Sequence, residues 1–208
     1  MPKAILFDLG NVLLPIDLSL TYQAFAAYST LNAVEIEKEI QENQLWVPYE
    51  SGHQTDVEFR NFLREHLALS CSDIEFDEAF SALLLDFHPG VFEWISDLKL
   101  HYSLYLLSNT SAIHAARFTK IPLGPEGQNI FSLFDHVYYS FDLGMVKPNP
   151  AIYQHVLSEQ NLKAEDVLFF DDNVANIKQA INVGIDSHLV DPTIDFTQIQ
   201  QILDSYVS

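Results

Sequence analysis

The sequence predicts an α/β protein with a mostly parallel sheet that is interrupted, after its first strand, by a block of helices. Short apolar runs alternate with segments of helical periodicity over residues 88–208, as in proteins built from strand–helix repeats. One further apolar run, residues 4–7, is separated from the others by about 70 residues of helical periodicity. Buried strands of parallel sheets read as continuous apolar segments, so these runs are expected to pair in one sheet.

Five segments are expected to form the strands of this sheet. Each is an apolar or aromatic run bounded by polar, Gly or Pro residues: 4–7, 102–107, 136–140, 167–170 and 185–190. Helices are expected where apolar residues recur at three- and four-residue spacing after position 88: 91–100, 113–118, 151–159, the stretch that ends at Gly184, and 196–206.

Residues 16–87 show no strand-like alternation and carry four apolar stripes at helical spacing. The stripes cover the following ranges: 20–28, 34–45, 57–67 and 74–87. We therefore expect two domains, an α/β core formed by residues 1–15 and 88–208 and a helical cap domain formed by residues 16–87. Helices inserted directly after the first strand would cover the end of that strand, exclude water and select substrates.

The charge of the chain argues against several classes of partner. It has 29 acidic and 10 basic residues, which give a formal net charge of −19. Binding to nucleic acid requires patches of Lys and Arg, and none is visible, while anionic membrane surfaces would repel such a chain. No apolar run is long enough to span a bilayer, and Met1-Pro2-Lys3 leads directly into the first expected strand without a signal peptide. The expected location is the cytoplasm, and the sequence does not indicate an oligomeric state.

Polar residues of different kinds follow the expected strands. Asp8 follows the first strand, Ser108-Asn109-Thr110 the second and Asp171-Asp172 the fourth, and Lys147 lies in a loop rich in Gly and Pro after the third. The carboxyl ends of parallel strands meet at one edge of a sheet, so these residues are expected to converge there. Taken alone, Asp8 fits equally well as the cap of a turn, since Asp is common in turns.

Together, these residues suit phosphoryl transfer. Carboxylates that meet at one edge repel one another unless a cation neutralises them, and oxygen ligands of this kind suit Mg²⁺. Lys147 can place a positive charge on phosphate oxygens, Ser108 can donate a hydrogen bond, and the backbone N–H groups after Asp8 can hold further oxygens. Asp8 could then attack phosphorus and become a transient aspartyl phosphate.

Four short motifs, in this order along the whole chain, resemble those of the haloacid dehalogenase-like (HAD) hydrolase superfamily. They are Phe7-Asp8-Leu9-Gly10-Asn11-Val12, Leu107-Ser108-Asn109-Thr110, Gly144-Met145-Val146-Lys147-Pro148 and Phe169-Phe170-Asp171-Asp172-Asn173. The resemblance implies a Rossmann-like parallel sheet with a helical cap, and a phosphoric monoester hydrolase. The form Asp-Leu-Gly-Asn-Val resembles the branch of sugar phosphatases typified by α-D-glucose-1-phosphate phosphatase.

The resemblance also implies roles for individual residues. The catalytic residues would be Asp8, as nucleophile, and Lys147, which would orient Asp8 and screen the phosphate charge. The phosphate-binding residues would be Leu9, Gly10, Ser108, Asn109 and Lys147. The Mg²⁺ ligands would be Asp8, the backbone carbonyl of Gly10, Asp172, and Asp171 through water or by pairing with Lys147. Asn176, one helical turn after Asp172, would support the ligands.

One position departs from the pattern of this superfamily. Most of its phosphatases have a second aspartate two residues after the nucleophile, where it acts as general acid and base, and this chain has Gly10 there. General acid–base catalysis contributes typically ~10²–10⁴-fold to a rate, so its loss would slow the enzyme without abolishing activity. Asn11, Asp17 or a cap residue such as His53 could compensate. A sugar 1-phosphate, with its comparatively good leaving group, would need an acid less.

The sequence thus predicts a Mg²⁺-dependent phosphatase that acts on a small phosphorylated metabolite, with a sugar phosphate as the expected substrate. The first alternative is a metal-independent 2-haloacid dehalogenase that attacks carbon through Asp8. The pair Asp171-Asp172 argues against it, because two carboxylates fit a cation and not the carboxylate of a haloacid. The second alternative is a non-catalytic protein that binds a small ligand on the same fold.

Overall fold

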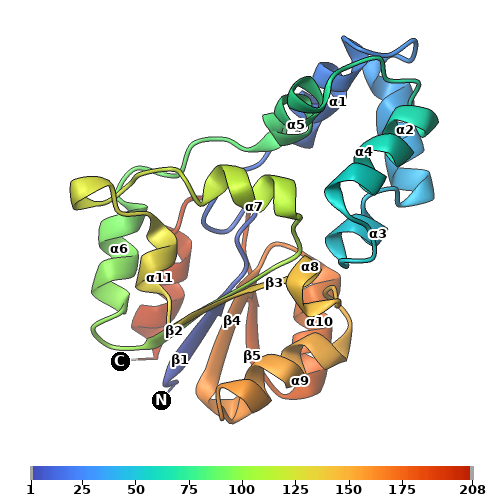
Figure 1. Cartoon of the computed structure of the whole chain (residues 1–208). Helices are drawn as coiled ribbons and strands as arrows, with labels where there is room; N and C mark the ends of the chain where they lie inside the picture. Colours follow the sequence, from blue (N-terminus) through green and yellow to red (C-terminus); the bar gives the residue numbers. More distant parts are fainter. Residues whose placement is uncertain (1, 207–208) are drawn as a thin grey trace.

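The computed structural model describes residues 2–206 and confirms the predicted α/β fold with a parallel sheet. The five strands lie in the order β3-β2-β1-β4-β5 (Figure 1). Their bounds are Ala4–Phe7 for β1, Ser103–Ser108 for β2, His136–Tyr139 for β3, Val167–Asp171 for β4 and Asp186–Leu189 for β5. Each predicted strand is present, and its observed ends lie within one residue of the predicted ones.

The first strand of the chain is the central strand of the sheet. Phe7 is aligned with Leu106 of β2 on one side and with Phe170 of β4 on the other. The backbone N–H of Asp8 extends the β4 pairing by donating to the carbonyl of Phe170, at 2.9 Å. Asp8 therefore leaves the sheet at its middle, with a strand end on either side of it.

Side chains of successive residues in β1 enter two different hydrophobic cores, one on each face of the sheet. Ile5 and Phe7 belong to the core that is completed by α6 (Val91–Leu98), α7 (Ala112–Phe118) and α11 (Thr197–Ser205). Ala4 and Leu6 belong to the core under α9 (Pro150–Glu159) and α10 (Val174–Val183). Because both faces are covered, the central strands are largely apolar, which is why they are recognisable in the sequence (Figure 1).

Short helical segments connect these elements. They are α8 (Ser140–Leu143) and the 3₁₀ turns η2 (Pro125–Gly127), η3 (Ile130–Leu133) and η4 (Ala164–Asp166). No helix within residues 2–206 combines the length and the apolar character that crossing a membrane requires.

Residues 18–83, called here the helical insertion, form helices beyond the end of β1 (Figure 1). They are α1 (Leu18–Ala26), α2 (Ala33–Asn43), α3 (Val47–Glu50), α4 (Asp56–His66), α5 (Asp73–Phe80) and the 3₁₀ turn η1 (Ser81–Leu83). Phe25, Phe59, Phe76 and Phe80 are fully buried in a core that is almost wholly the insertion's own. The predicted division into core and cap domains stays a prediction, which this separate packing supports.

The helix predicted from the last apolar stripe of the insertion, residues 74–87, is shorter in the structure than the spacing of the stripe indicates. Helix α5 ends at Phe80, and the chain is extended after η1. There it pairs with the segment that enters the insertion: Asp17 N donates to Leu83 O, and Leu85 N donates to Pro15 O, at 2.9 and 3.1 Å. The two segments that join the insertion to the sheet satisfy each other's backbone groups, which a helix continued to residue 87 would prevent.

Helix α3, which the sequence does not predict, is fastened to elements of the α/β core. The Tyr49 hydroxyl donates to Asp56 Oδ1 at 2.7 Å and accepts from the backbone N–H of Ile113 in α7 at 3.2 Å. Gly52, just after α3, has φ +72°, and a Cβ there would lie 2.2 Å from the carbonyl oxygen of Phe141 in α8. Only glycine allows the two backbones to come this close.

We predict that Gly52→Ala destabilises the protein more than Gly127→Ala. Both glycines have positive φ, but a Cβ at Gly127 would meet no atom within 4 Å. Gly127→Ala should therefore cost about 1 kcal/mol for the left-handed backbone alone. Gly52→Ala should cost a further 1–3 kcal/mol, on the order of an overpacking penalty, because a backbone carbonyl has little freedom to move aside. Urea unfolding of both variants measures the difference, and equal costs would contradict the close approach.

Candidate active site

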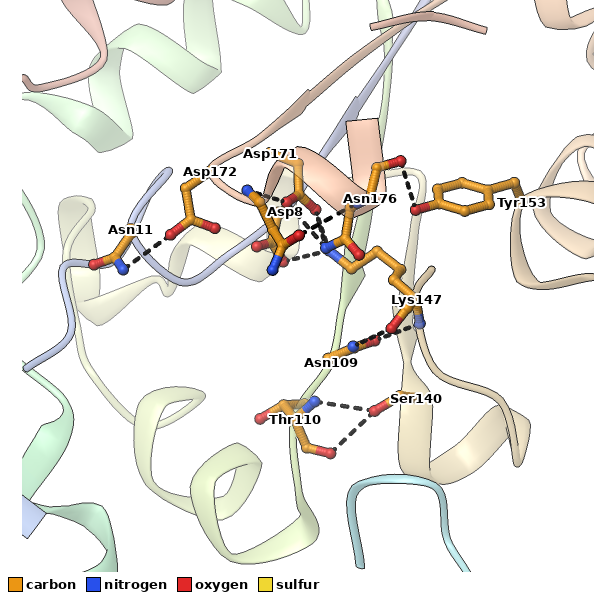
Figure 2. Close-up of polar contacts among 11 residues, drawn as sticks. Asp8, Asn11, Asn109, Thr110, Ser140, Lys147, Tyr153, Asp171, Asp172 and Asn176 are labelled. Atoms are coloured by element: carbon orange, nitrogen blue, oxygen red, sulfur yellow. Dashed lines mark hydrogen bonds and ion pairs between the residues drawn. The ribbon is translucent and has the colours of Figure 1, made fainter. Parts of the chain in front are cut away.

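A buried ammonium group lies between two carboxylates at the carboxyl edge of the sheet. Lys147 Nζ is 2.8 Å from Asp8 Oδ1 and 2.6 Å from Asp171 Oδ2 (Figure 2). The side chains of Lys147 and Asp171 are almost fully buried and that of Asp8 is 12% exposed. Asp8 follows β1, Asp171 ends β4, and Lys147 comes from the loop before α9, so three separate segments meet here as the sequence predicts.

Asp171 is held by several donors besides Lys147. Its Oδ1 accepts from the backbone N–H of Asn173 at 2.8 Å, and both of its oxygens lie 3.0 Å from Asn176 Nδ2. The backbone carbonyl of Asn176 in turn accepts from the Tyr153 hydroxyl at 3.1 Å. In the sequence Asn176 lies one helical turn after Asp172. In the structure it holds the neighbouring carboxylate, that of Asp171 (Figure 2).

The second carboxylate of the pair, Asp172, is oriented from the turn that follows β1. Asn11 has φ 57°, and its Nδ2 donates to Asp172 Oδ2 at 3.0 Å while its Oδ1 accepts from the backbone N–H of Ile16 at 3.1 Å. One oxygen each of Asp8, Asp171 and Asp172 lies within 4.8 Å of the others. Hard oxygen donors at this spacing fit a divalent cation such as Mg²⁺.

The loop that carries Lys147 is tied to the end of β2. Lys147 N donates to Asn109 Oδ1 at 2.8 Å, and Asn109 Nδ2 donates back to Lys147 O at 2.9 Å. Next to it, Thr110 N donates to Ser140 Oγ at 3.0 Å, and that hydroxyl donates to Thr110 O at 3.1 Å. The side chain of Asn109 therefore positions Lys147, a contact that the sequence does not predict, and a contact of Asn109 with phosphate stays a prediction.

The charges of this cluster do not balance. Burial raises the pKa of Asp8 to about 7, against the attraction of Lys147, and repulsion by Asp171 adds to the rise. Burial also raises the pKa of Asp172. The Lys147 ammonium loses hydration on burial, but the two carboxylates beside it outweigh that loss and raise its pKa. Three carboxylates share one ammonium, so a second positive charge would stabilise all of them in their ionised form.

A cavity of about 90 Å³ lies between this edge and the helical insertion. Its floor contains residues that follow β1 and β2, and its far wall contains residues of the insertion. Its polar lining residues are Glu50, Ser108, Asn109, Thr110 and His114. The rest of its wall is largely apolar: Leu9, Gly10, Leu14, Ile16, Leu18, Trp46, Leu83, Leu84 and Phe118. The predicted phosphate-binding residues Leu9, Gly10, Ser108 and Asn109 therefore all face one cavity.

Glu50 is the residue of this cavity that sequence reasoning missed. It ends α3, is partly buried, and burial raises its pKa to about 7. Within residues 2–206 its carboxylate has no hydrogen bond or ion pair. Two features of the sequence could have pointed to Glu50: it lies close to Gly52 in a predicted break between helices, and it directly follows the apolar residues 46–49.

The three residues that the sequence offers in place of an acid at Gly10 have other surroundings. Asn11 is engaged by Asp172 and Ile16, as described above. Asp17 is the N-cap of α1, where it accepts from Ser19 N at 2.9 Å. His53 is exposed and does not line the cavity, and its Nδ1 lies 3.0 Å from Ser51 Oγ.

Comparison with known proteins identifies the family of this chain, the haloacid dehalogenase-like hydrolases. Residues 2–184 match the model of this family, so the chain belongs to it and is a hydrolase. The chain is 25% identical over 198 residues to D-ribitol-5-phosphate phosphatase of Bacteroides thetaiotaomicron, and the match covers 95% of this chain and 96% of that relative.

Solved structures show the same relationship. A HAD family enzyme from Bacteroides thetaiotaomicron, in complex with magnesium and inorganic phosphate, superposes with a TM-score of 0.88 at 28% identity, over 96% of this chain and 99% of the other. The L-2-haloacid dehalogenase of Xanthobacter autotrophicus has a TM-score of 0.62 at 18% identity, over 91% of this chain and 78% of the other. At that identity the likeness concerns the fold alone.

We predict that His114 makes the protein less stable in acid. Burial lowers the pKa of His114 to about 4, against about 6.5 for an unfolded histidine. The unfolded chain therefore takes up the proton first as the pH falls, so stability is lost below about pH 6.5. Between pH 7 and pH 5 the wild type should lose about 2 kcal/mol relative to His114→Gln, in which no proton is taken up. Urea unfolding at both pH values measures this, and an equal change in the two proteins would contradict it.

Proposed function

We propose that the protein is a Mg²⁺-dependent phosphatase that hydrolyses a small sugar or polyol phosphate through a phosphorylated Asp8. The observation that carries the proposal is the contact of Lys147 Nζ with Asp8 and Asp171, together with a third carboxylate, Asp172, whose oxygen lies within 4.8 Å of oxygens of the other two. A site with this excess of oxygen ligands suits a metal ion and a phosphate together. The phosphatase named among its relatives, which matches nearly the whole chain, supports the same reading.

The metal would be held by Asp8, Asp172 and the backbone carbonyl of Gly10, with Asp171 close by. The spacing of the three carboxylate oxygens fits it, and the direct pairing of Asp171 with Lys147 favours a contact of Asp171 with the metal through water. When bound, Mg²⁺ would neutralise the carboxylates and draw electron density from the phosphoryl oxygens.

The residues of the chain itself would then position and attack the phosphate. Lys147 holds one oxygen of Asp8 at 2.8 Å, which orients the other oxygen for in-line attack on phosphorus. The Ser108 hydroxyl and the backbone N–H groups of Leu9 and Gly10 would hold the remaining phosphate oxygens from the floor of the cavity. Water would later release phosphate from Asp8 and restore the carboxylate.

The helical insertion would act as the cap that selects the substrate. It supplies the largely apolar far wall of the cavity, including Leu18, Trp46 and Leu83. The metal-independent dehalogenase finds less support, because the Asp171–Asp172 pair would repel the carboxylate of a haloacid.

We predict that Asp8→Asn abolishes phosphatase activity while the protein stays folded. The amide is a poor nucleophile and carries no charge for the metal, so kcat should fall about 10³-fold or more. Asp17→Asn is the matched control, since Asp17 caps α1 at the surface and an asparagine can accept the same hydrogen bond. The assay is hydrolysis of p-nitrophenyl phosphate with Mg²⁺, and circular dichroism checks folding. Full turnover by Asp8→Asn would rule out the proposed nucleophile.

We predict that EDTA removes the activity and that Mg²⁺ restores it. Without the cation, three carboxylates and a phosphate would share the single positive charge of Lys147. Phosphate release from p-nitrophenyl phosphate before chelation, after chelation and after addition of Mg²⁺ measures the effect. Halide release from a 2-haloacid that persists in EDTA would instead support the dehalogenase.

A further inference from the structure

Hydrolysis of an alkyl phosphate requires a proton donor that the strand edge does not offer. When Asp8 attacks phosphorus, the bond to the leaving oxygen breaks, and an alkoxide leaves slowly unless it is protonated. Asp171 is occupied by Lys147 and Asn176, and Asp172 by Asn11. Gly10, which lines the cavity, has no side chain.

The leaving oxygen would depart into the cavity. In-line attack places the nucleophile and the leaving group on opposite sides of phosphorus. Asp8 lies at the strand end, and the cavity lies between that end and the helical insertion. A proton donor is therefore expected on the far wall, the part of the cavity that the insertion contributes.

The far wall carries one carboxyl group among the residues that the structure describes, that of Glu50. It has no partner in the described chain, and its surroundings include the apolar side chains of Trp46 and Leu83. The side chain is partly buried, so a carboxyl group that lines the cavity without a hydrogen bond is available to a ligand there. Its raised pKa, about 7, means that much of it carries a proton at neutral pH.

His114, the other titratable residue of the cavity lining, does not offer that proton. Its Nε2 lies 3.1 Å from the carbonyl oxygen of Phe80, which can only accept, so Nε2 carries the hydrogen and is engaged. Its Nδ1 is then the acceptor of a neutral ring. Burial lowers the pKa of His114 to about 4, so the ring stays neutral at physiological pH.

We propose that Glu50 is the general acid and base of the reaction; this inference rests on the proposed phosphatase function. In the first step Asp8 Oδ forms a bond to phosphorus, the ester P–O bond breaks, and the proton of the Glu50 carboxyl passes to the leaving oxygen. In the second step water attacks phosphorus and gives its proton to the Glu50 carboxylate, while the bond from phosphorus to Asp8 breaks. Glu50 and Asp8 both return to their starting states.

The structure also fixes the place of Glu50. Tyr49 binds the backbone of Ile113, and Gly52 packs against Phe141, so the residues on either side of Glu50 are anchored to the α/β core. Trp46, one turn earlier, lines the same cavity, and its indole N–H is buried without a partner in residues 2–206. A proton donor requires such a fixed position to be effective.

The test is the dependence of Glu50→Gln on the leaving group. The variant keeps the shape of the side chain and loses the proton that it can give. For D-ribitol 5-phosphate or D-glucose 6-phosphate, whichever the wild type hydrolyses faster, kcat/KM should fall about 10²–10⁴-fold. For p-nitrophenyl phosphate, whose leaving group departs as a stable anion, kcat/KM should change less than about threefold, because its departure requires no proton. Glu42→Gln, an exposed carboxylate of α2, is the control and should leave both values unchanged.

The outcomes separate this inference from the proposed function. Equal losses on both substrates would overturn it in favour of a structural or binding role, and so would the absence of any loss on the alkyl phosphate. A wild type that hydrolyses p-nitrophenyl phosphate but no alkyl phosphate would also overturn it. A wild type that is inactive on both with Mg²⁺ would instead refute the phosphatase itself.

Discussion

The placement of one ammonium group, Lys147 Nζ, constrains the whole carboxyl edge of the sheet. It is buried against Asp8 and Asp171, and each of the three groups would be strongly destabilised without the others. The pairing requires that β1 and β4 be neighbours and that the loop after β3 reach across β2 to them. Asn109 meets that requirement by binding both backbone polar groups of Lys147. The contact of Lys147 with Asp8 and Asp171 therefore depends on the order of the strands in the sheet.

The α/β core and the helical insertion contribute different features to this edge. The α/β core supplies fixed charges, because its strand ends are held by pairing on both sides. The helical insertion supplies the far wall of the cavity, and Gly52, just after α3, packs closely against Phe141 of the core. In the proposed reaction the charges that act on phosphate would stay the same while the insertion varied with the substrate, which agrees with the use of one fold for several reactions.

Much of the fold was predictable because both faces of the sheet are covered. Residues 167–170 of β4 are apolar throughout, and Asp8 and Asp171 stand where such runs end, while Lys147 lies in a loop rich in Gly and Pro. Glu50 was not predictable in the same way. It lies in a four-residue helix, too short for a periodic pattern, and its surroundings come from contacts between α3 and residues more than 50 positions away. The pairing of Asn109 with Lys147 depends likewise on where a loop folds back.

The central position of β1 has a consequence for how the chain is synthesised. Residues 18–83 make most of their contacts among themselves, so the helical insertion can pack early, while β1 waits for distant partners. One neighbour, β2, begins at residue 103, and the other, β4, begins only at residue 167. Until then β1 is an apolar strand with an unpaired edge, the kind of segment that associates wrongly. The strand that precedes Asp8 is thus open to wrong association until β4 has been synthesised, and a folded insertion next to it would shield it.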